Sequence, residues 1–195
     1  MNVVVEIGCR EQPGPFFEGA DRHYIVDPDA ENLAKGALTD VAFTAVVADA
    51  SNLDFLADAS VNTFLARNVF GDPALFTDST KRREMQAEVI ELLEASKVAE
   101  AYERTTAAEI ECAPLKSAIL SEAGRVLVVG GRLIVVEQYS PNVARRFFKS
   151  IAGDPALTGG LDIKSASLPA IAPASYVEHQ VDAEPVLVAW TAQKH

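Results

Sequence analysis

Three acidic residues near the start of the chain stand at or next to the ends of apolar runs: Glu6, Asp27 and Asp49. Gly8 follows the first run, where the absence of a side chain lets a ligand approach the backbone. Asp27 lies 19 residues after Gly8, an offset that suits a carboxylate accepting both hydroxyl groups of a ribose. Asp49 is then placed to accept a hydrogen bond from an exocyclic amine. The pattern predicts that an adenosine binds across three strand ends.

The apolar runs that carry these acids predict strands, because continuous apolar runs are typical of parallel strands covered on both faces. The carboxyl ends of such strands meet at one edge of a sheet, so the three acids are expected to lie side by side. Strands are expected at residues 2–7, 23–27, 42–48, 60–66 and 132–137, the last after a turn at 130–131. Helices are expected at residues 28–37, 79–104 (capped by Asp78 or Ser79), 114–124 and 140–151 (capped by Ser140).

The last part of the sequence predicts an antiparallel pair of strands, in contrast to the parallel strands before it. Residues 153–174 are rich in Gly, Ala, Ser and Pro and are expected to form a surface loop or lid. Strands expected at 175–181 and 185–192 are separated by a few residues, so they predict an antiparallel hairpin. We therefore expect an α/β fold: one domain spanning 1–195, with a Rossmann-like, mostly parallel seven-stranded sheet, helices on both faces and a C-terminal antiparallel hairpin.

Composition narrows the range of functions. The chain has 195 residues, 49% of them hydrophobic, which is enough for a core without disulfides or a structural metal. No apolar run reaches the roughly 18 residues of a membrane span, and no signal peptide is expected at the N-terminus. The net charge of −11 opposes binding to phosphate backbones. Cys9 and Cys112 form no disulfide or zinc pattern, nor do the three histidines, so we expect a cytoplasmic protein without a metal site.

Several segments, in order, resemble the motifs of class I S-adenosylmethionine-dependent methyltransferases. Residues 3–9 (VVVEIGC) resemble the first motif of that family, and Ile25-Val26-Asp27-Pro28 resembles its ribose-binding acidic motif. Residues 48–53 (ADASNL) are similar to the adenine-side motif, and 58–69 to the fourth-strand segment. Residues 124–137 resemble the glycine turn and fifth strand. The resemblance spans roughly residues 2–140.

The resemblance implies S-adenosylmethionine as cofactor and methyl transfer to a small molecule as the activity. The net charge and the lack of a long apolar run predict no nucleic-acid and no membrane partner. The residues at the matching motif positions would contact the cofactor. Glu6 and Gly8 would border its methionine end and its sugar, and Asp27 would hold the ribose. Asp49 and Ala50 would face the adenine, and Asn68 would lie near the amino-acid part or the acceptor. The implied cofactor-binding set is Glu6, Gly8, Cys9, Asp27, Pro28, Asp49, Ala50 and Asn68.

Two departures from the family pattern bear on this prediction. Arg10 replaces the usual second glycine, so its side chain either crowds the methionine portion or pairs with the methionine carboxylate. The first strand is expected at the very start of the chain, so cover for the pocket is expected from residues 72–112, residues 153–174 or another subunit. The apolar face of the helix at 79–104 is expected to pack in the core, with a dimer contact as the alternative use.

The general base is left open, with Asn68, Asp72 and Tyr139 as candidates by position. Cys9 is expected to pack rather than act as a nucleophile, because no base is placed beside it. Two other functions are alternatives on the same fold. One is a methyltransferase-like binding or regulatory protein without activity, which the altered first motif suggests. The other is an NAD-dependent oxidoreductase, which the Gly8-to-Asp27 offset permits but the absence of a Gly-x-Gly-x-x-Gly run opposes.

Overall fold

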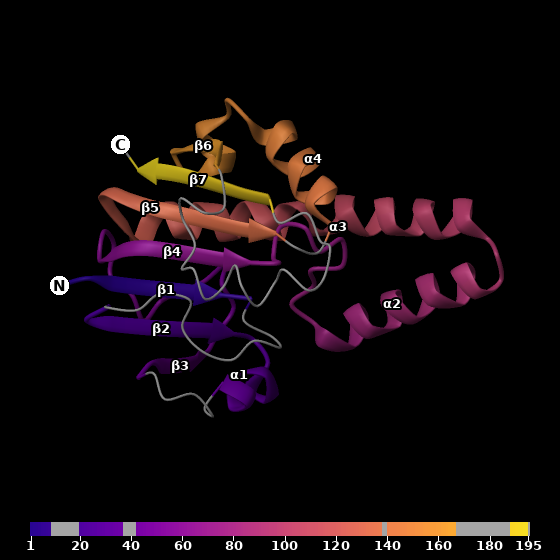
Figure 1. Cartoon of the computed structure of the whole chain (residues 1–195), viewed down its shortest axis with the longest axis horizontal. Coiled ribbons are helices and arrows are strands. Elements are labelled where there is room, and N and C mark those ends of the chain that lie inside the picture. Colours follow the sequence, from indigo (N-terminus) through magenta and orange to yellow (C-terminus); the bar gives the residue numbers. More distant parts are fainter. Residues whose placement is uncertain (9–19, 37–41, 138–139, 167–187, 195) are drawn as a thin grey trace.

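The computed structural model describes residues 1–8, 20–36, 42–137, 140–166 and 188–194 (Figure 1). Seven strands form one sheet in the order β3-β2-β1-β4-β5-β7-β6. The pairs β1–β2, β2–β3, β1–β4 and β4–β5 are parallel, whereas β7 runs antiparallel to both β5 and β6. The strands are β1 (Val3–Ile7), β2 (Arg22–Asp27), β3 (Thr44–Val47), β4 (Val61–Arg67), β5 (Leu127–Glu137), β6 (Leu161–Ala166) and β7 (Val188–Lys194). The predicted mostly parallel α/β sheet with an antiparallel ending is confirmed.

Helices cover both faces of the sheet, as the sequence predicted. On one face, alternate residues of β1 such as Val5 belong to the same buried cluster as Ile119 of α3 (Val98–Val126) and Phe147 of α4 (Pro141–Ile151). On the other face, Ile25 of β2 packs against Leu33 of α1 (Ala30–Gly36). All five residues of β1 are buried, which accounts for its continuous apolar run.

The segment predicted as one helix at 79–104 is instead a hairpin of two helices. The helix α2 (Ser79–Glu94) is followed by its C-cap residue Ala95, and α3 begins at Val98. Ser96 adopts a left-handed conformation (φ 58°), and the amide of Lys97 donates to the carbonyl of Leu92, which closes the helix end. The start of α2 was predicted correctly. The Asp78 side chain caps it by accepting hydrogen bonds from the amides of Thr80 and Lys81.

The separate helix predicted at 114–124 is part of α3, which continues through Pro114. Ser140 occupies the predicted N-cap position of α4, but its side chain makes no capping hydrogen bond and the residue is left-handed (φ 50°). The turn predicted at 130–131 lies inside β5, where the register with β4 shifts between Val61 and Thr63. The strand therefore starts five residues earlier than residue 132.

The loop predicted at 153–174 contains a short helix, α5 (Pro155–Thr158), and the strand β6. Within the described residues, β7 is paired antiparallel with β5 on one side and with β6 on the other, and the strand predicted at 175–181 lies outside the described residues. The strands β6 and β7 are separated by residues 167–187, so the predicted short hairpin connection is wrong. The antiparallel end of the sheet is nonetheless as predicted.

Candidate functional site

A cavity of about 440 Å³ lies at the carboxyl edge of the parallel strands. In Figure 1 these strands point toward the base of the α2–α3 hairpin. The sheet side of the cavity is lined by residues at the ends of β1, β2 and β4 and by those that follow β3. The hairpin side is lined by residues between Leu75 and Arg83 and by Leu115 and Ile119 of α3. The volume lies within the roughly 300–1,000 Å³ of small-molecule sites.

The ends of β1 and β4 meet so closely that only glycine fits at position 8. Gly8 has a positive φ of 79°, and a Cβ there would overlap the carbonyl oxygen of Arg67 and lie 2.7 Å from Cγ2 of Val69. Next to this contact, Asn68 is itself left-handed (φ 52°), and its amide donates to the carbonyl of Val136 at 2.8 Å. Gly8 and Asn68 both line the cavity, and their contact with a ligand stays a prediction.

Asp27 lies at the end of β2 and lines the cavity while its side chain is largely buried. Its Oδ1 accepts hydrogen bonds from the amide of Asp29 at 2.8 Å and from Nδ2 of Asn32 at 3.2 Å. These bonds fix the carboxylate at the start of α1. A carboxylate offers about four acceptor positions, so the group can accept further hydrogen bonds from a ligand. Pro28, which follows, also lines the cavity.

Asp49 follows β3 and lines the same cavity, together with Ala50. Its Oδ1 accepts hydrogen bonds from both the amide and the hydroxyl of Ser51, each at 2.8 Å. The bond to the amide two residues ahead is an Asx turn, which sets the orientation of the carboxylate. The structure thus brings together Gly8, Asp27, Asp49 and Asn68, which the sequence placed at separate strand ends.

Glu6 has different surroundings from these residues. Its side chain is fully buried and is not part of the cavity lining. It forms an ion pair with Arg67 of β4, and its Oε2 lies 3.1 Å from Nε2 of His23 on β2. The two partners are buried as well, so the cluster ties three neighbouring strands together. A contact between Glu6 and a cofactor stays a prediction from the family resemblance.

Two buried side chains, Glu137 of β5 and Lys116 of α3, hold the segment that follows β4. Glu137 Oε1 accepts from the amide of Phe70 at 2.9 Å, and Lys116 Nζ donates to the carbonyl of Phe70 at 2.8 Å. Both side chains are buried. Burial raises the pKa of Glu137 to about 8 and lowers the pKa of Lys116 below its ordinary value. Both polar groups of the Phe70 backbone are therefore held by buried ionisable side chains of α3 and β5.

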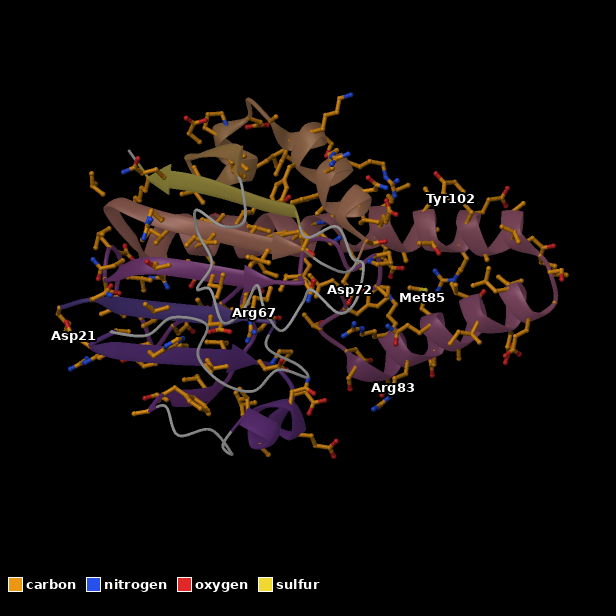
Figure 2. All side chains as sticks on the ribbon, in the orientation of Figure 1. Asp21, Arg67, Asp72, Arg83, Met85 and Tyr102 are labelled. Atoms are coloured by element: carbon orange, nitrogen blue, oxygen red, sulfur yellow. The ribbon has the colours of Figure 1, made fainter. Side chains whose placement is uncertain are left out.

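Asp72, a candidate base, is buried at the base of the hairpin, where Figure 2 shows it. Its Oδ1 accepts from the amide of Ala74 at 2.9 Å, and its Oδ2 pairs with the guanidinium of Arg82. Arg82 in turn lines the cavity. The geometry gives Asp72 the role of orienting Arg82, and a role as general base stays a prediction.

Three residues of interest, Cys9, Arg10 and Tyr139, lie outside the described residues. Cys112 is buried, and this burial raises the pKa of its thiol to about 11, so it is not poised as a nucleophile. Within the ranges that the structure describes, no three His, Cys, Asp or Glu side chains are grouped to hold a metal ion.

Sequence reasoning missed most of the hairpin side of the cavity. It named residues 72–112 as cover without identifying which of them face the ligand. Arg82 carries no local signal, because its partner Asp72 lies ten residues earlier and the two meet only in the folded chain. Leu115 and Ile119 follow the helical spacing that also marks core residues. The remaining lining residues of this wall are Leu75, Phe76, Thr77, Ser79 and Arg83.

No protein-family model matches the sequence, and no curated protein matches it. Solved structures do match. A Clostridium thermocellum protein whose proposed activity is rRNA methylation is 16% identical, with a TM-score of 0.56 over 100% of this chain and 89% of its own. An antibiotic-related methyltransferase is 11% identical, with a TM-score of 0.54 over 100% of this chain and 88% of its own. The proposed methyltransferase bound to the Haloferax volcanii activator Trm112 is 14% identical, with a TM-score of 0.52 over 100% of this chain and 83% of its own.

The chain therefore has the Rossmann-like fold of class I S-adenosylmethionine-dependent methyltransferases, as its motifs predicted. The strand order and the antiparallel ending agree with this likeness. In the described part of the chain, no helix combines the length and the apolar character that a membrane crossing requires.

Proposed function

We propose that this protein transfers a methyl group from S-adenosylmethionine to a small-molecule acceptor. The observation that carries the proposal is the joint position of Asp27, Asp49 and Gly8 on the wall of one cavity. Asp27 is placed to accept the ribose hydroxyls, and Asp49 to accept the exocyclic amine of adenine. Gly8 leaves room for the cofactor beside the backbone. These residues fit the cofactor, which supplies an electrophilic methyl group on a sulfonium.

The hairpin wall is suited to the acceptor. Leu75, Phe76, Leu115 and Ile119 provide apolar surface there, while Arg82 provides a charge that Asp72 orients. Such a wall can exclude water and align an acceptor with the methyl group, which is the main contribution that a protein makes to this reaction. Asn68, at the junction with the sheet, lies between the two parts of the cavity wall and is placed to orient either ligand.

Two features favour a small acceptor over a nucleic acid. The net charge of −11 repels a phosphate backbone, and the cavity has the size of a small-molecule site. Methylation of rRNA, the activity proposed for the Clostridium thermocellum protein, is the competing reaction on the same fold. NAD-dependent oxidation is the competing chemistry for the same ribose-binding acid.

Calorimetric titration with S-adenosylhomocysteine tests the cofactor site. We expect Asp27→Ala to weaken binding by roughly tenfold or more, since a hydrogen bond to a charged group contributes about 1.5–3 kcal/mol. Asp21→Ala is the matched control, because Asp21 is an exposed acid at the opposite end of β2 and Figure 2 shows it at the far edge. Equal affinity of both variants, or tighter binding of NAD than of S-adenosylhomocysteine, would overturn the cofactor assignment.

The acceptor class needs a separate assay. Protein and methyl-labelled S-adenosylmethionine are incubated either with a low-molecular-weight cell extract or with total RNA. Label transferred to the extract, and lost in Asp27→Ala, supports the small acceptor. Label in the RNA, or in neither fraction despite measured binding of S-adenosylhomocysteine, contradicts it. The second result would favour the alternative of a binding protein without activity.

A further inference from the structure

The α2–α3 hairpin extends beyond the sheet (Figure 1). Its two helices carry exposed apolar residues. Between its helices lies a thin core, with Met85, Ala101 and Ala108 buried and Met85 visible between the helices in Figure 2. Of the ten large hydrophobic residues exposed in the described part of the chain, five lie on these two helices. Helices draw most of their stability from packing. The large exposed apolar surface on this thin hairpin therefore indicates a docking surface.

Four of these residues share one side of the hairpin near its tip. They are Ile90 and Leu93 of α2 and Val98 and Tyr102 of α3, exposed by 55%, 50%, 64% and 63%. We call them the hairpin patch. At about 100° per residue, helical geometry places all four on the same side of the plane through the two helices.

The opposite side of the hairpin is closed by ion pairs between its helices. Lys81 of α2 pairs with Glu111 of α3, and Arg104 Nε lies 2.6 Å from Glu88 Oε2. By the same helical geometry, these four charged residues lie across the hairpin from the patch. The hairpin is thus polar and satisfied on one side and apolar and exposed on the other.

The charges along α2 favour a second copy of this chain as the occupant. Basic residues cluster in its first turns, and acidic residues follow toward the tip. Arg83, Ala87, Ile90 and Glu94 form a 4–3–4 stripe of exposed positions, which is the spacing of a helix–helix contact. In an antiparallel pairing about a two-fold axis, Arg83 meets Glu94 of the second copy and Ala87 meets its Ile90. Each pair occurs twice, because a two-fold contact is self-complementary.

We propose that this stripe, which includes Ile90 of the hairpin patch, forms the interface of a two-fold symmetric dimer, with α2 antiparallel to α2 of the second copy. The arrangement has a consequence for the site, because Arg83 also lines the cavity. The tip of one hairpin then lies at the rim of the other copy's cavity and covers it. The dimer supplies cover from another subunit, and the proposal stands whether or not the cavity binds S-adenosylmethionine.

Sedimentation equilibrium and light scattering on the full chain test the interface. We expect the wild-type protein to be dimeric at roughly 100 μM, well above a dissociation constant near 1 μM. Ile90→Glu is expected to raise that constant at least about tenfold, because it places a charge in the contact. Val129→Glu is the matched control, since Val129 is 75% exposed and lies on β5, away from the hairpin. A monomeric wild-type protein, or equal effects of both variants, would refute the proposal.

Charge reversal tests the register. Arg83→Glu and Glu94→Arg are each expected to weaken the dimer, because each single change sets like charges opposite one another. The double variant restores the opposite charges and is expected to recover most of the wild-type association. Circular dichroism confirms that each variant is folded. Failure of the double variant to recover, with the helical signal intact, overturns the antiparallel pairing.

Discussion

Replacing Gly8 by alanine tests how tightly the ends of β1 and β4 are fitted together. The substitution adds one methyl group at a residue whose φ is 79°. That methyl group would overlap the carbonyl oxygen of Arg67, a backbone atom that moves only if β4 moves. The change therefore combines an unfavourable conformation with a steric conflict at the wall of the cavity.

The two contributions can be separated within this chain. Left-handed backbone costs a non-glycine residue about 1–2 kcal/mol, and overpacking adds about 1–3 kcal/mol, so we expect Gly8→Ala to lower the free energy of unfolding by about 2–5 kcal/mol. Gly160 has nearly the same φ of 76°, but no atom lies within 4 Å of the position of its Cβ. Gly160→Ala should therefore cost only the conformational part, about 1–2 kcal/mol.

Urea unfolding of the wild-type protein and both variants measures these differences, and calorimetric titration with S-adenosylhomocysteine measures the effect on the site. We expect Gly8→Ala to lose more stability than Gly160→Ala and also to bind more weakly, because β4 carries Asn68 at its end. Equal destabilisation by the two substitutions would refute the steric argument. Wild-type affinity in Gly8→Ala would show that the fit between the strands does not shape the cavity.

Two further predictions concern Glu137 and Lys116, the two buried ionisable side chains that contact the backbone of Phe70. Because burial raises the pKa of Glu137 from 4.5 to about 8, the folded protein binds this proton more tightly than the unfolded chain. The contribution of Glu137 to the free energy of unfolding is thus full below pH 4.5 and is lost as the pH rises to about 8, at up to about 1.4 kcal/mol per pH unit. Urea unfolding across this range should show that Glu137→Gln removes that slope; an unchanged slope would contradict the assignment. Lys116→Met should cost about 1.5–3 kcal/mol, since the carbonyl of Phe70 loses a charged donor. Exposed Lys149→Met is the control, and an equal loss of stability in both variants would contradict the role of Lys116.

The strands could be predicted from the sequence because burial on both faces leaves continuous apolar runs. The run that ends at Ile7 is the clearest case, since every residue of β1 is buried. The break between α2 and α3 could not be predicted in this way. It depends on Ser96 adopting a left-handed conformation, which glycine usually provides, so no local signal marks it. At Pro114 the sequence predicted a helix boundary that the structure does not have. Proline usually interrupts a helix, but here it is accommodated inside α3.

The site could be predicted where the chain continues directly from a strand into the cavity wall. Asp27 and Asp49 fulfil this condition, and both line the cavity. Glu6 lies one residue before the end of β1, and successive side chains of a strand point to opposite faces. Ile7 packs in the main core, and Glu6 therefore faces the other side, where it meets Arg67. Contacts of this kind depend on the neighbouring strand, which no local sequence pattern specifies.

The acids near the strand ends therefore divide into two groups with different tasks. Glu6 and Glu137 are fully buried on opposite faces of the sheet, and both contact β4 or the residues just after it. Asp27 and Asp49 bond to the turns that follow them and face the cavity. Because the end of β4 is held from both faces and abuts Gly8, it forms a rigid wall, as a preorganised site requires. The hairpin, which packs around a thin core of its own, forms the cavity wall opposite this edge of the sheet.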